Sequence, residues 1–308
     1  MAVKARYPFL YLVLASTLLA ALLLFFGGAR QRHSLPSTVL SRDKVALVDI
    51  SGVITSSQSA PRGVTGARDL LRELKKHGDD NSVRAVVLRI DSPGGTVVAA
   101  QEIYNALKRL RDEKGKVVVA SMADVSASGG YYIACAADHI VANPGTITGS
   151  IGVIMKFPNF EGLFGKVGIR TVTIKSGKFK DTGNSSREMT EEERELLQNL
   201  LDDVHRQFIE DVAAGRGMPV EEVIPLADGR IFTGRRAREL GLVDETGDLR
   251  SAVLKAAELA GIEGEPSIVS EKRKSRFWDL IESRVAGILP LSSADRPSLN
   301  GRLLYLWQ

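Results

Sequence analysis

Cysteine and histidine are scarce in this sequence, and their scarcity excludes several kinds of site. The 308 residues include one cysteine, Cys135, and four histidines. A single cysteine can form neither an internal disulfide nor a cysteine-based zinc cluster. Because Cys135 stands in an apolar run, residues 132–137, we expect its side chain to be buried in the core.

The sequence also lacks a strong excess of charge of either sign. It has 41 lysines and arginines against 37 aspartates and glutamates, which gives a formal net charge of +4. The densest basic run, residues 272–276, is short and lies near the end of the chain. A protein that follows a phosphate backbone needs a more extended basic surface, so we expect no nucleic-acid partner.

One long apolar segment stands near the N-terminus. Residues 7–29 carry no charge, and residues 9–26 are almost wholly apolar. Eighteen helical residues extend about 27 Å, which is close to the hydrocarbon thickness of a bilayer. A cleaved signal peptide, the alternative, usually has a shorter apolar core of about 7–15 residues. We therefore predict a cytoplasmic tail and transmembrane anchor over residues 1–29.

The predicted anchor determines the expected location of the rest of the chain. Residues 30–42 are polar and form a linker. The basic residues that flank the anchor on its two sides nearly balance, so the charge rule for orientation gives little direction. The simpler topology has a short cytoplasmic tail. It places the remainder outside the cytoplasm, attached to the cytoplasmic membrane by a single pass.

Strand-like and helix-like runs alternate through the middle of the chain. Apolar β-rich runs occupy residues 45–50, 85–90, 117–120, 140–142 and 171–174, and helical periodicity occupies 69–77, 99–111, 129–136 and a long segment from 190. That segment opens with Thr190 and Glu193 in a capping-box pattern, and its apolar stripe comprises Leu196, Leu197, Leu200, Leu201, Val204 and Phe208. This alternation predicts βαβ units, and hence an α/β domain with a largely parallel sheet, over residues 43–262. Residues 263–308 are polar and rich in proline and serine, which is typical of an attached tail.

Three glycine-bearing turns follow predicted strands. In residues 91–95, two glycines let backbone N–H groups approach a ligand, which suits a developing oxyanion, although a plain tight turn has the same pattern. In residues 126–131, Ser128 lies at the predicted junction between a strand and a helix. A nucleophile suits this position because the helix dipole favours negative charge there, but a helix N-cap has the same pattern. The third turn, residues 145–152, is rich in hydroxyls and glycines, and it lines a site or simply reverses the chain.

A nucleophilic serine needs a base, and the histidines do not supply an obvious one. Surface or structural roles suffice for all four, so a Ser-His-Asp triad is hard to assemble. Lysine can serve instead if burial lowers its pKa. The candidates are Lys175, Lys178 and Lys180, and the pattern alone leaves the choice between them open.

Six segments, taken in order, resemble the signal peptide peptidase A family in its short bacterial form. They are residues 91–95 (DSPGG), 128–132 (SGGYY), 148–152 (TGSIG), 176–181 (SGKFKD), 183–190 (GNSSREMT) and 228–235 (DGRIFTGR). Six motifs in order are far more specific than one. The resemblance covers about residues 43–260, and it implies a crotonase-like spiral fold of ββα units, related to that of Clp proteases.

The resemblance also implies a role for each matching residue. Ser128 matches the nucleophile, Lys180 the general base, and Ser150 a serine that orients the lysine. The backbone N–H groups of Gly95 and Gly129 match the oxyanion hole. The family implies a ring-shaped homo-oligomer whose catalytic residues can come from neighbouring subunits, with signal peptides or other apolar peptides as substrates. It implies no metal or nucleotide cofactor.

Two alternatives and one hypothesis complete these expectations. A crotonase acting on acyl-CoA and an inactive, membrane-bound peptide-binding scaffold are the competing functions. The tail contains two apolar clusters, residues 277–281 and 303–307, which are expected to contact the parent domain, the membrane or a groove. We hypothesise that residues 303–307 enter a peptide groove of their own or a neighbouring subunit as an added extended strand.

Overall fold

The structure is a computed structural model that describes residues 43–58, 63–270 and 304–306. Over those residues, no helix is both long enough and apolar enough to span a bilayer. The predicted anchor and linker, residues 1–42, lie outside the described part, as does most of the predicted tail. Their boundaries therefore stay predictions.

A mostly parallel sheet forms the centre of the protein. Its main path runs β10 (Glu245–Thr246), β7 (His139–Ala142), β6 (Val117–Ala127), β4 (Val83–Ser92), β1 (Lys44–Ser51) and β11 (Ser267–Ser270), with every neighbouring pair parallel. The central strands are apolar runs that are largely buried on both faces, as strands between two helical layers must be. The predicted α/β class with a largely parallel sheet is confirmed.

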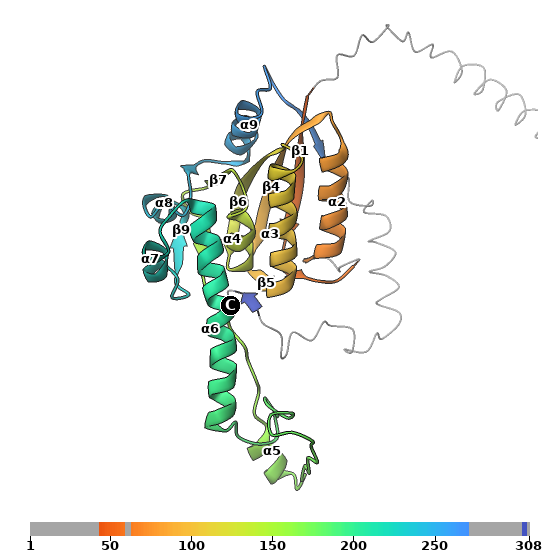
Figure 1. Cartoon of the computed structure of the whole chain (residues 1–308), viewed down its shortest axis with the longest axis vertical. Helices are drawn as coiled ribbons and strands as arrows, with labels where there is room; N and C mark the ends of the chain where they lie inside the picture. Colours follow the sequence, from red (N-terminus) through yellow and green to blue (C-terminus); the bar gives the residue numbers. More distant parts are fainter. Residues whose placement is uncertain (1–42, 59–62, 271–303, 307–308) are drawn as a thin grey trace, which may run out of the picture. The chain divides into compact units, whose positions relative to one another are not determined.

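Helices cover both faces of this sheet. On one face lie α2 (Ala67–Asp79), α3 (Val97–Asp112) and α4 (Gly129–Ala134), which share the larger core with β1, β4 and β6. On the other face, α9 (Leu249–Leu259) packs its alanines against a smaller apolar cluster. Figure 1 shows α2, α3 and α4 side by side over the sheet. Cys135, at the end of α4, is buried as predicted.

Several very short strands build the turns at the carboxyl ends of β4 and β6. A small sheet runs in the order β12 (Leu304–Leu306), β5 (Gly94–Thr96), β2 (Val53–Thr55) and β3 (Val64–Gly66). Next to it, β8 (Ile147–Gly149) pairs with β6 and with β9 (Ile231–Thr233). Three further short helices follow along the chain: α7 (Val220–Val223), η1 (Ile224–Leu226) and α8 (Gly234–Glu239).

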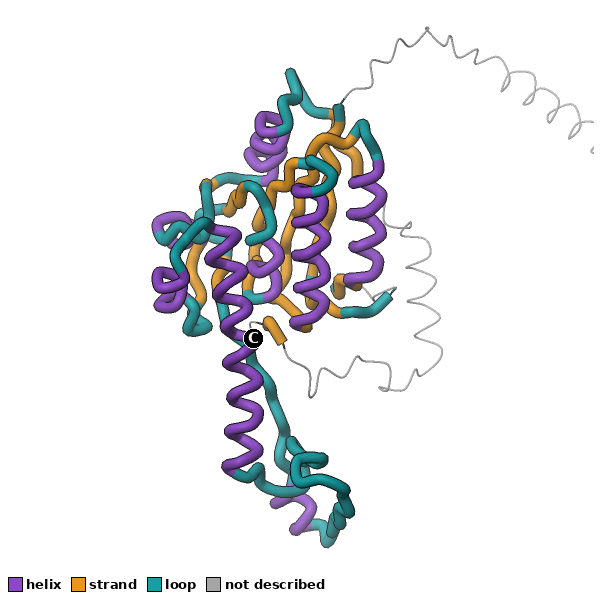
Figure 2. The backbone as a smooth tube through the Cα atoms, in the orientation of Figure 1, coloured by secondary structure: helices purple, strands orange, loops and turns teal. Residues whose placement is uncertain are grey.

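One segment, which we call the arm, projects from this body. It comprises residues 155–201: the loops around α5 (Glu161–Lys166) and the first part of α6 (Glu191–Arg216). Figures 1 and 2 show α6 running out of the body beside a long loop that carries α5. The predicted capping box at the start of α6 is present: the Thr190 hydroxyl accepts from the Glu193 N–H, and the Glu193 carboxylate accepts from the Thr190 N–H.

Two predictions are wrong within the arm. Residues 171–174 form no strand: Val172 is 83% exposed and Ile174 is 96% exposed. β-Branched residues favour a strand only when a neighbouring strand accepts the pairing, and no strand of the described chain pairs with these residues. The apolar stripe predicted along α6 is buried only toward its end, because Leu196 and Leu200 face solvent whereas Phe208 is fully buried.

Candidate active site

Ser128 lies at the junction between β6 and α4 in a strained conformation. Its backbone has φ 53° and ψ −118°, a region that costs a non-glycine residue on the order of 1–3 kcal/mol. Two backbone hydrogen bonds hold the turn: the Ser128 N–H donates to the Gly149 carbonyl at 2.8 Å, and the Ser128 carbonyl accepts from the Tyr132 N–H at 2.8 Å. A sharp strand-to-helix turn of this kind presents a serine side chain away from its neighbours.

The Ser128 hydroxyl is buried and unpaired. The residue is 1% exposed, and Oγ has no hydrogen-bond partner among the residues that the structure describes. Leaving a buried hydroxyl unsatisfied costs on the order of 1–3 kcal/mol, so such a group calls for a functional explanation.

The glycine turn at residues 94–95 lies against the Ser128 turn. Ser92, at the end of β4, pairs with Ser126, near the end of β6, and α4 contacts β5. A Cβ at Gly95 would come within 1.9 Å of the Ile54 carbonyl oxygen, so only glycine allows this approach of β5 to β2. These two turns carry Gly95 and Gly129, the residues whose N–H groups the resemblance assigns to the oxyanion hole, and the structure places the two turns side by side.

Ser92 fixes the shape of that glycine turn, a role that the sequence analysis missed. Its side chain is fully buried. Oγ donates to the Gly52 carbonyl at 2.6 Å and accepts from the Gly94 N–H at 3.1 Å. Gly94 adopts φ 104°, which only glycine adopts easily, so the hydroxyl holds an unusual backbone in place. Serine is common in turns, and nothing in the pattern distinguished this one.

Ser150 lies beside Ser128 in a second strained turn. Among the described residues, these two serines are the only non-glycine residues with positive φ; that of Ser150 is 51°. The Ser150 N–H donates to the Arg230 carbonyl at 2.8 Å, while the preceding residue, Gly149, accepts from Ser128. The backbone hydrogen bonds of Arg230 and Gly149 thus hold the Ser150 turn beside the Ser128 turn. The role that the resemblance implies for Ser150 stays a prediction.

Lys180 lies in the arm, in a run of turns at residues 178–183, and it is exposed. The other two lysines of its segment are already paired: Lys175 with Asp181, and Lys178 with Glu192 at 2.5 Å. The Lys180 side chain has no ion-pair partner among the residues described. Of the three candidate lysines, it is therefore the one whose amine is not committed to a carboxylate.

Charged residues clamp the Lys180 loop to the first turn of α6. The Arg187 guanidinium reaches Glu193 with contacts of 2.5 and 2.8 Å and reaches Asp181 at 3.0 Å. Hydrogen bonds from Lys175, and then from Arg187, lower the pKa of Asp181 to about 2. Hydrogen bonds from Arg187, and then from the Thr190 backbone, lower the pKa of Glu193 to about 2. The loop is therefore tied to the start of α6 by charged contacts.

Within one chain, the arm holds Lys180 well away from Ser128. The Phe208 ring packs on Tyr132, one helical turn after Ser128, with ring centroids 5.0 Å apart. Glu193, which holds the lysine loop through Arg187, precedes Phe208 by fifteen residues of the same helix, or about 22 Å. The described chain therefore joins Ser128, Ser150 and the glycine turn, but it does not bring Lys180 to them.

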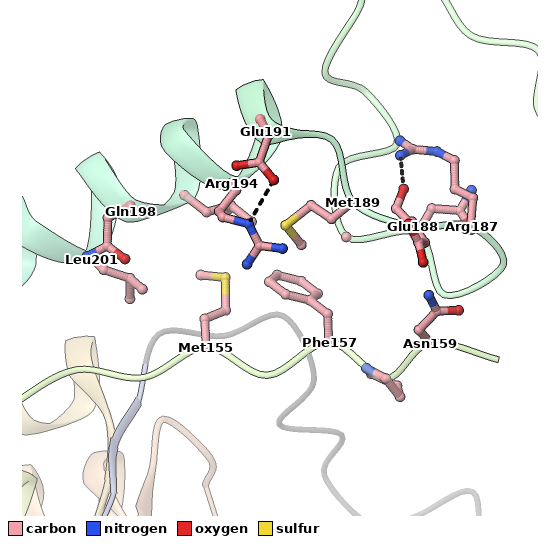
Figure 3. A pocket seen from close by; sticks show the side chains of 14 residues that line it. Met155, Phe157, Asn159, Arg187, Glu188, Met189, Glu191, Arg194, Gln198 and Leu201 are labelled. Carbon is pink, nitrogen blue, oxygen red and sulfur yellow. Dashed lines mark hydrogen bonds and ion pairs between the residues drawn. The ribbon is translucent and has the colours of Figure 1, made fainter. Parts of the chain in front are cut away.

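The arm also contains a pocket that no sequence motif predicted. Its volume is about 600 Å³, and it lies between the segment at Met155 and Phe157 and the start of α6. Figure 3 shows Met155, Phe157 and Met189 on one part of its lining, with Arg194 and Glu191 joined by an ion pair. The lining as a whole mixes polar and apolar side chains. Because this pocket lies in the arm, it is separate from the Ser128 site.

The C-terminal strand reaches the glycine turn. β12 pairs with β5 in antiparallel register, with Leu304 opposite Thr96, Tyr305 opposite Gly95 and Leu306 opposite Gly94. Figure 1 shows it as the short blue-violet arrow beside β5. For residues 304–306, this confirms the expectation that the last apolar cluster docks on its own domain as an added strand.

Comparison with known proteins identifies the class. The sequence profile of a family described as Peptidase family S49 matches residues 110–263. The "Putative protease" of Synechocystis sp. is 48% identical over 74% of this chain and 78% of its own. "Protease 4" of Haemophilus influenzae is 36% identical over 70% of this chain, which spans only 35% of that longer protein. The "Putative signal peptide peptidase SppA" of Enterococcus faecium is 34% identical over 73% of this chain and 66% of its own.

The fold, the strained serine and these relatives define a serine peptidase. The chain belongs to peptidase family S49, which confirms the resemblance inferred from the six motifs. Family membership favours peptide hydrolysis over the two competing functions, an acyl-CoA enzyme and an inactive scaffold.

Proposed function

We propose that this peptidase is a membrane-anchored endopeptidase that hydrolyses residual signal peptides and other apolar peptides after protein export. Ser128 is the nucleophile and Lys180 the general base. The Ser128 turn carries the proposal, because its strained backbone presents a buried hydroxyl with no partner among the described residues. Backbone strain and an unsatisfied buried hydroxyl at one residue both lower the stability of the fold. Such features are found mainly at functional sites.

The mechanism assigns one task to each group. The neutral Lys180 amine takes the proton from Ser128 Oγ, and the oxygen attacks the carbonyl carbon of the peptide bond. The N–H groups of Gly95 and Gly129 stabilise the oxyanion, and the Ser150 hydroxyl orients the lysine amine. The C–N bond then breaks, the amine leaves with the proton, and water hydrolyses the acyl-enzyme.

We place the complete site between two subunits of a ring. Two observations support this. The Lys180 loop is clamped to Glu193, which lies about 22 Å along α6 from Phe208, the residue that packs on Tyr132. The arm also exposes a set of large apolar side chains. These include Phe160, Leu163, Val167, Ile169, Val172, Ile174, Phe179, Leu196 and Leu200. Exposed apolar surface of this extent is typical of a contact surface. Burial in that contact would also supply the desolvation that a lysine base requires.

The anchor and the substrate class rest on other support. Residues 7–29 are long and apolar enough to span a bilayer, and the printed name of the Enterococcus faecium relative describes a signal peptide peptidase. A single-pass anchor would hold the catalytic domain outside the cytoplasm, where cleaved signal peptides remain in the adjoining membrane. We further propose that the parallel sheet and its short edge strands form a crotonase-like spiral of ββα units.

Hydrolysis of an apolar fluorogenic peptide by the full chain in mild detergent tests the catalytic residues. Ser128→Ala and Lys180→Ala should each abolish turnover while leaving the unfolding temperature nearly unchanged. Lys178→Ala is the matched control, since it removes a lysine from the same loop, and it should retain substantial activity. An inactive Lys178→Ala beside an active Lys180→Ala would show that the base is wrongly assigned.

Mixing the two inactive variants tests the shared site. In a ring with head-to-tail contacts, a site that takes its serine from one subunit and its lysine from the next is intact in about a quarter of random pairings. Co-assembled Ser128→Ala and Lys180→Ala subunits should therefore recover about a quarter of wild-type activity. No recovery, in assemblies shown to contain both variants, would place both residues of each site in the same subunit.

A further inference from the structure

Helix α4, which follows the Ser128 turn directly, is poorly suited to hold that turn by itself. It has only six residues, Gly129–Ala134, and it begins with two glycines. Helices this short are unstable in isolation, and glycine is among the weakest helix formers. The strained backbone of Ser128 adds a further cost, and such strain persists only where the surrounding structure fixes it. Contacts from outside α4 must therefore keep the helix in place.

Two consecutive tyrosines of α4 provide such contacts with their hydroxyl groups. Tyr131 is fully buried, and its hydroxyl donates to the Leu242 carbonyl at 2.9 Å. The hydroxyl of Tyr132 donates to the Asp211 carboxylate, on α6. Tyr132 also donates its backbone N–H to the Ser128 carbonyl at 2.8 Å. One residue therefore joins α6 to the turn that carries the proposed nucleophile.

The contact with Asp211 lies beside a cluster of aromatic rings. The Tyr132 ring packs against those of Tyr104 and Phe208, with ring centroids 4.9 and 5.0 Å away. Burial, and then the charge of Asp211, raise the pKa of Tyr104, so the carboxylate faces this cluster. A hydrogen bond that a carboxylate accepts is about twice as strong as one between neutral groups. Of the two hydroxyl contacts that hold α4, the one to Asp211 is therefore the stronger.

The last turns of α6 are held by further contacts of their own. Phe208 is fully buried, and the Arg216 guanidinium binds the Asp244 carboxylate through two nitrogens, at 2.6 and 3.0 Å. A Cβ at Gly215 would come within 2.2 Å of the Cys135 carbonyl oxygen, so α6 packs directly on the end of α4. The body thus fixes this part of α6 without Asp211, and α4 is the element that depends on the link.

We propose that Asp211 is a positioning residue for the reaction. Its carboxylate holds the Tyr132 hydroxyl, and through it the start of α4, next to Ser128 Oγ and the Gly129 N–H. The inference rests on the proposed function, in which Ser128 is the nucleophile and the Gly129 N–H stabilises the oxyanion. Because an error of about 1 Å in placing a catalytic group can lower the rate about a hundredfold, loosening α4 impairs catalysis before the protein unfolds.

The kinetics of Asp211→Ala, in the full chain in mild detergent, test the proposal. This variant should lower kcat for an apolar fluorogenic peptide by about 10- to 100-fold with KM nearly unchanged, because the reacting groups are displaced while the peptide still binds. Asp203→Ala is the matched control: it removes an exposed aspartate of the same helix, which accepts from Gln207 at 3.0 Å, and it should keep kcat. Equal kcat in the two variants would overturn the proposal.

A double-variant comparison tests whether Asp211 acts through Tyr132. Tyr132→Phe removes only the hydroxyl, and it should lower kcat to about the same degree as Asp211→Ala. Because the two residues share one hydrogen bond, the double variant should lose no more kcat than either single variant. Losses that add in the double variant would show that the two side chains act independently, and would overturn the proposal.

Hydrogen exchange locates the effect and does not depend on hydrolysis. In Asp211→Ala, the protection of amides in residues 129–135 should fall, while that of the arm should stay as in Asp203→Ala. Unchanged protection in α4, or a loss confined to the arm, would overturn the proposal, because Asp211 would then not hold α4. If the wild-type chain hydrolyses no peptide, the proposed function fails, and the exchange measurement still decides whether Asp211 holds this helix.

Discussion

Replacing Ser92 with alanine separates the structural role of this hydroxyl from its effect on catalysis. The substitution deprives the Gly52 carbonyl of a 2.6 Å hydrogen bond and the Gly94 N–H of a 3.1 Å one. Ser92 is fully buried, so water does not readily replace the lost partner. Each buried group left unpaired costs about 1–3 kcal/mol, and for the two groups we expect the free energy of unfolding to fall by about 2–6 kcal/mol in total.

Activity should fall further than this loss of stability explains. The bond from the Gly94 N–H to Ser92 holds the turn that carries Gly95, whose N–H is a proposed oxyanion donor. Removing one such donor typically lowers kcat by about 10²- to 10³-fold. We therefore expect Ser92→Ala to lower kcat about 100-fold at a temperature where the variant is still folded, with a much smaller change in KM.

The assay pairs thermal unfolding, followed by circular dichroism, with initial rates on an apolar fluorogenic peptide. Ser121→Ala is the matched control: Ser121 is also buried, lies in β6, and accepts a hydrogen bond from Arg89 at 3.0 Å. This variant should lose stability but keep kcat. If Ser92→Ala and Ser121→Ala lose the same small amount of kcat, the argument that Ser92 positions the glycine turn is refuted.

Three further predictions concern the space around Gly95, the effect of acid on the arm, and the pH dependence of activity. Gly95→Ala should abolish hydrolysis, because its Cβ would meet a β2 carbonyl oxygen at 1.9 Å, whereas Gly145→Ala, with open space around it, should remain active. The pKa of Asp181 falls from 3.8 to about 2 in the fold, and that of Glu193 from 4.5 to about 2, so their stabilisation is present above pH 4.5 and is lost as the pH falls to 2. The protection of arm amides against hydrogen exchange, measured relative to their intrinsic rates at each pH, should fall over that range, and constant protection would contradict the clamp. Because Lys180 must be neutral to accept a proton, activity should rise with pH, and full activity at pH 5 would exclude it as the base.

The sequence predicted the elements that a local pattern of residues specifies. Strands β1, β4 and β6 are continuous apolar runs, and the capping box at Thr190 and Glu193 marks the start of α6. Ser128 was placed at a strand-to-helix junction because a strand pattern gives way to glycines there. These features follow from local composition, and the structure has them where they were expected.

The elements that the sequence did not predict depend on distant partners. Strands β2, β5 and β8 have three residues each, too few for any alternation to be visible. The apolar residues at 171–174 look like a strand and are exposed, because a pattern shows that a face is apolar but not whether the same chain covers it. The distance of Lys180 from Ser128 has the same origin, since it is set by the direction in which α6 leaves the body.

The ion pairs of Arg187 attach the Lys180 loop to the end of α6 that projects from the body. The body holds this helix where the Phe208 ring packs on Tyr132, and the helix from Phe208 to Glu193 is about 22 Å long. A rotation of α6 by about 10° about the Phe208 contact would move the loop by about 4 Å, and an error of about 1 Å in placing a catalytic group can lower the rate a hundredfold. Substitutions in the apolar seat of Phe208 should therefore change the turnover number of a site that they do not touch.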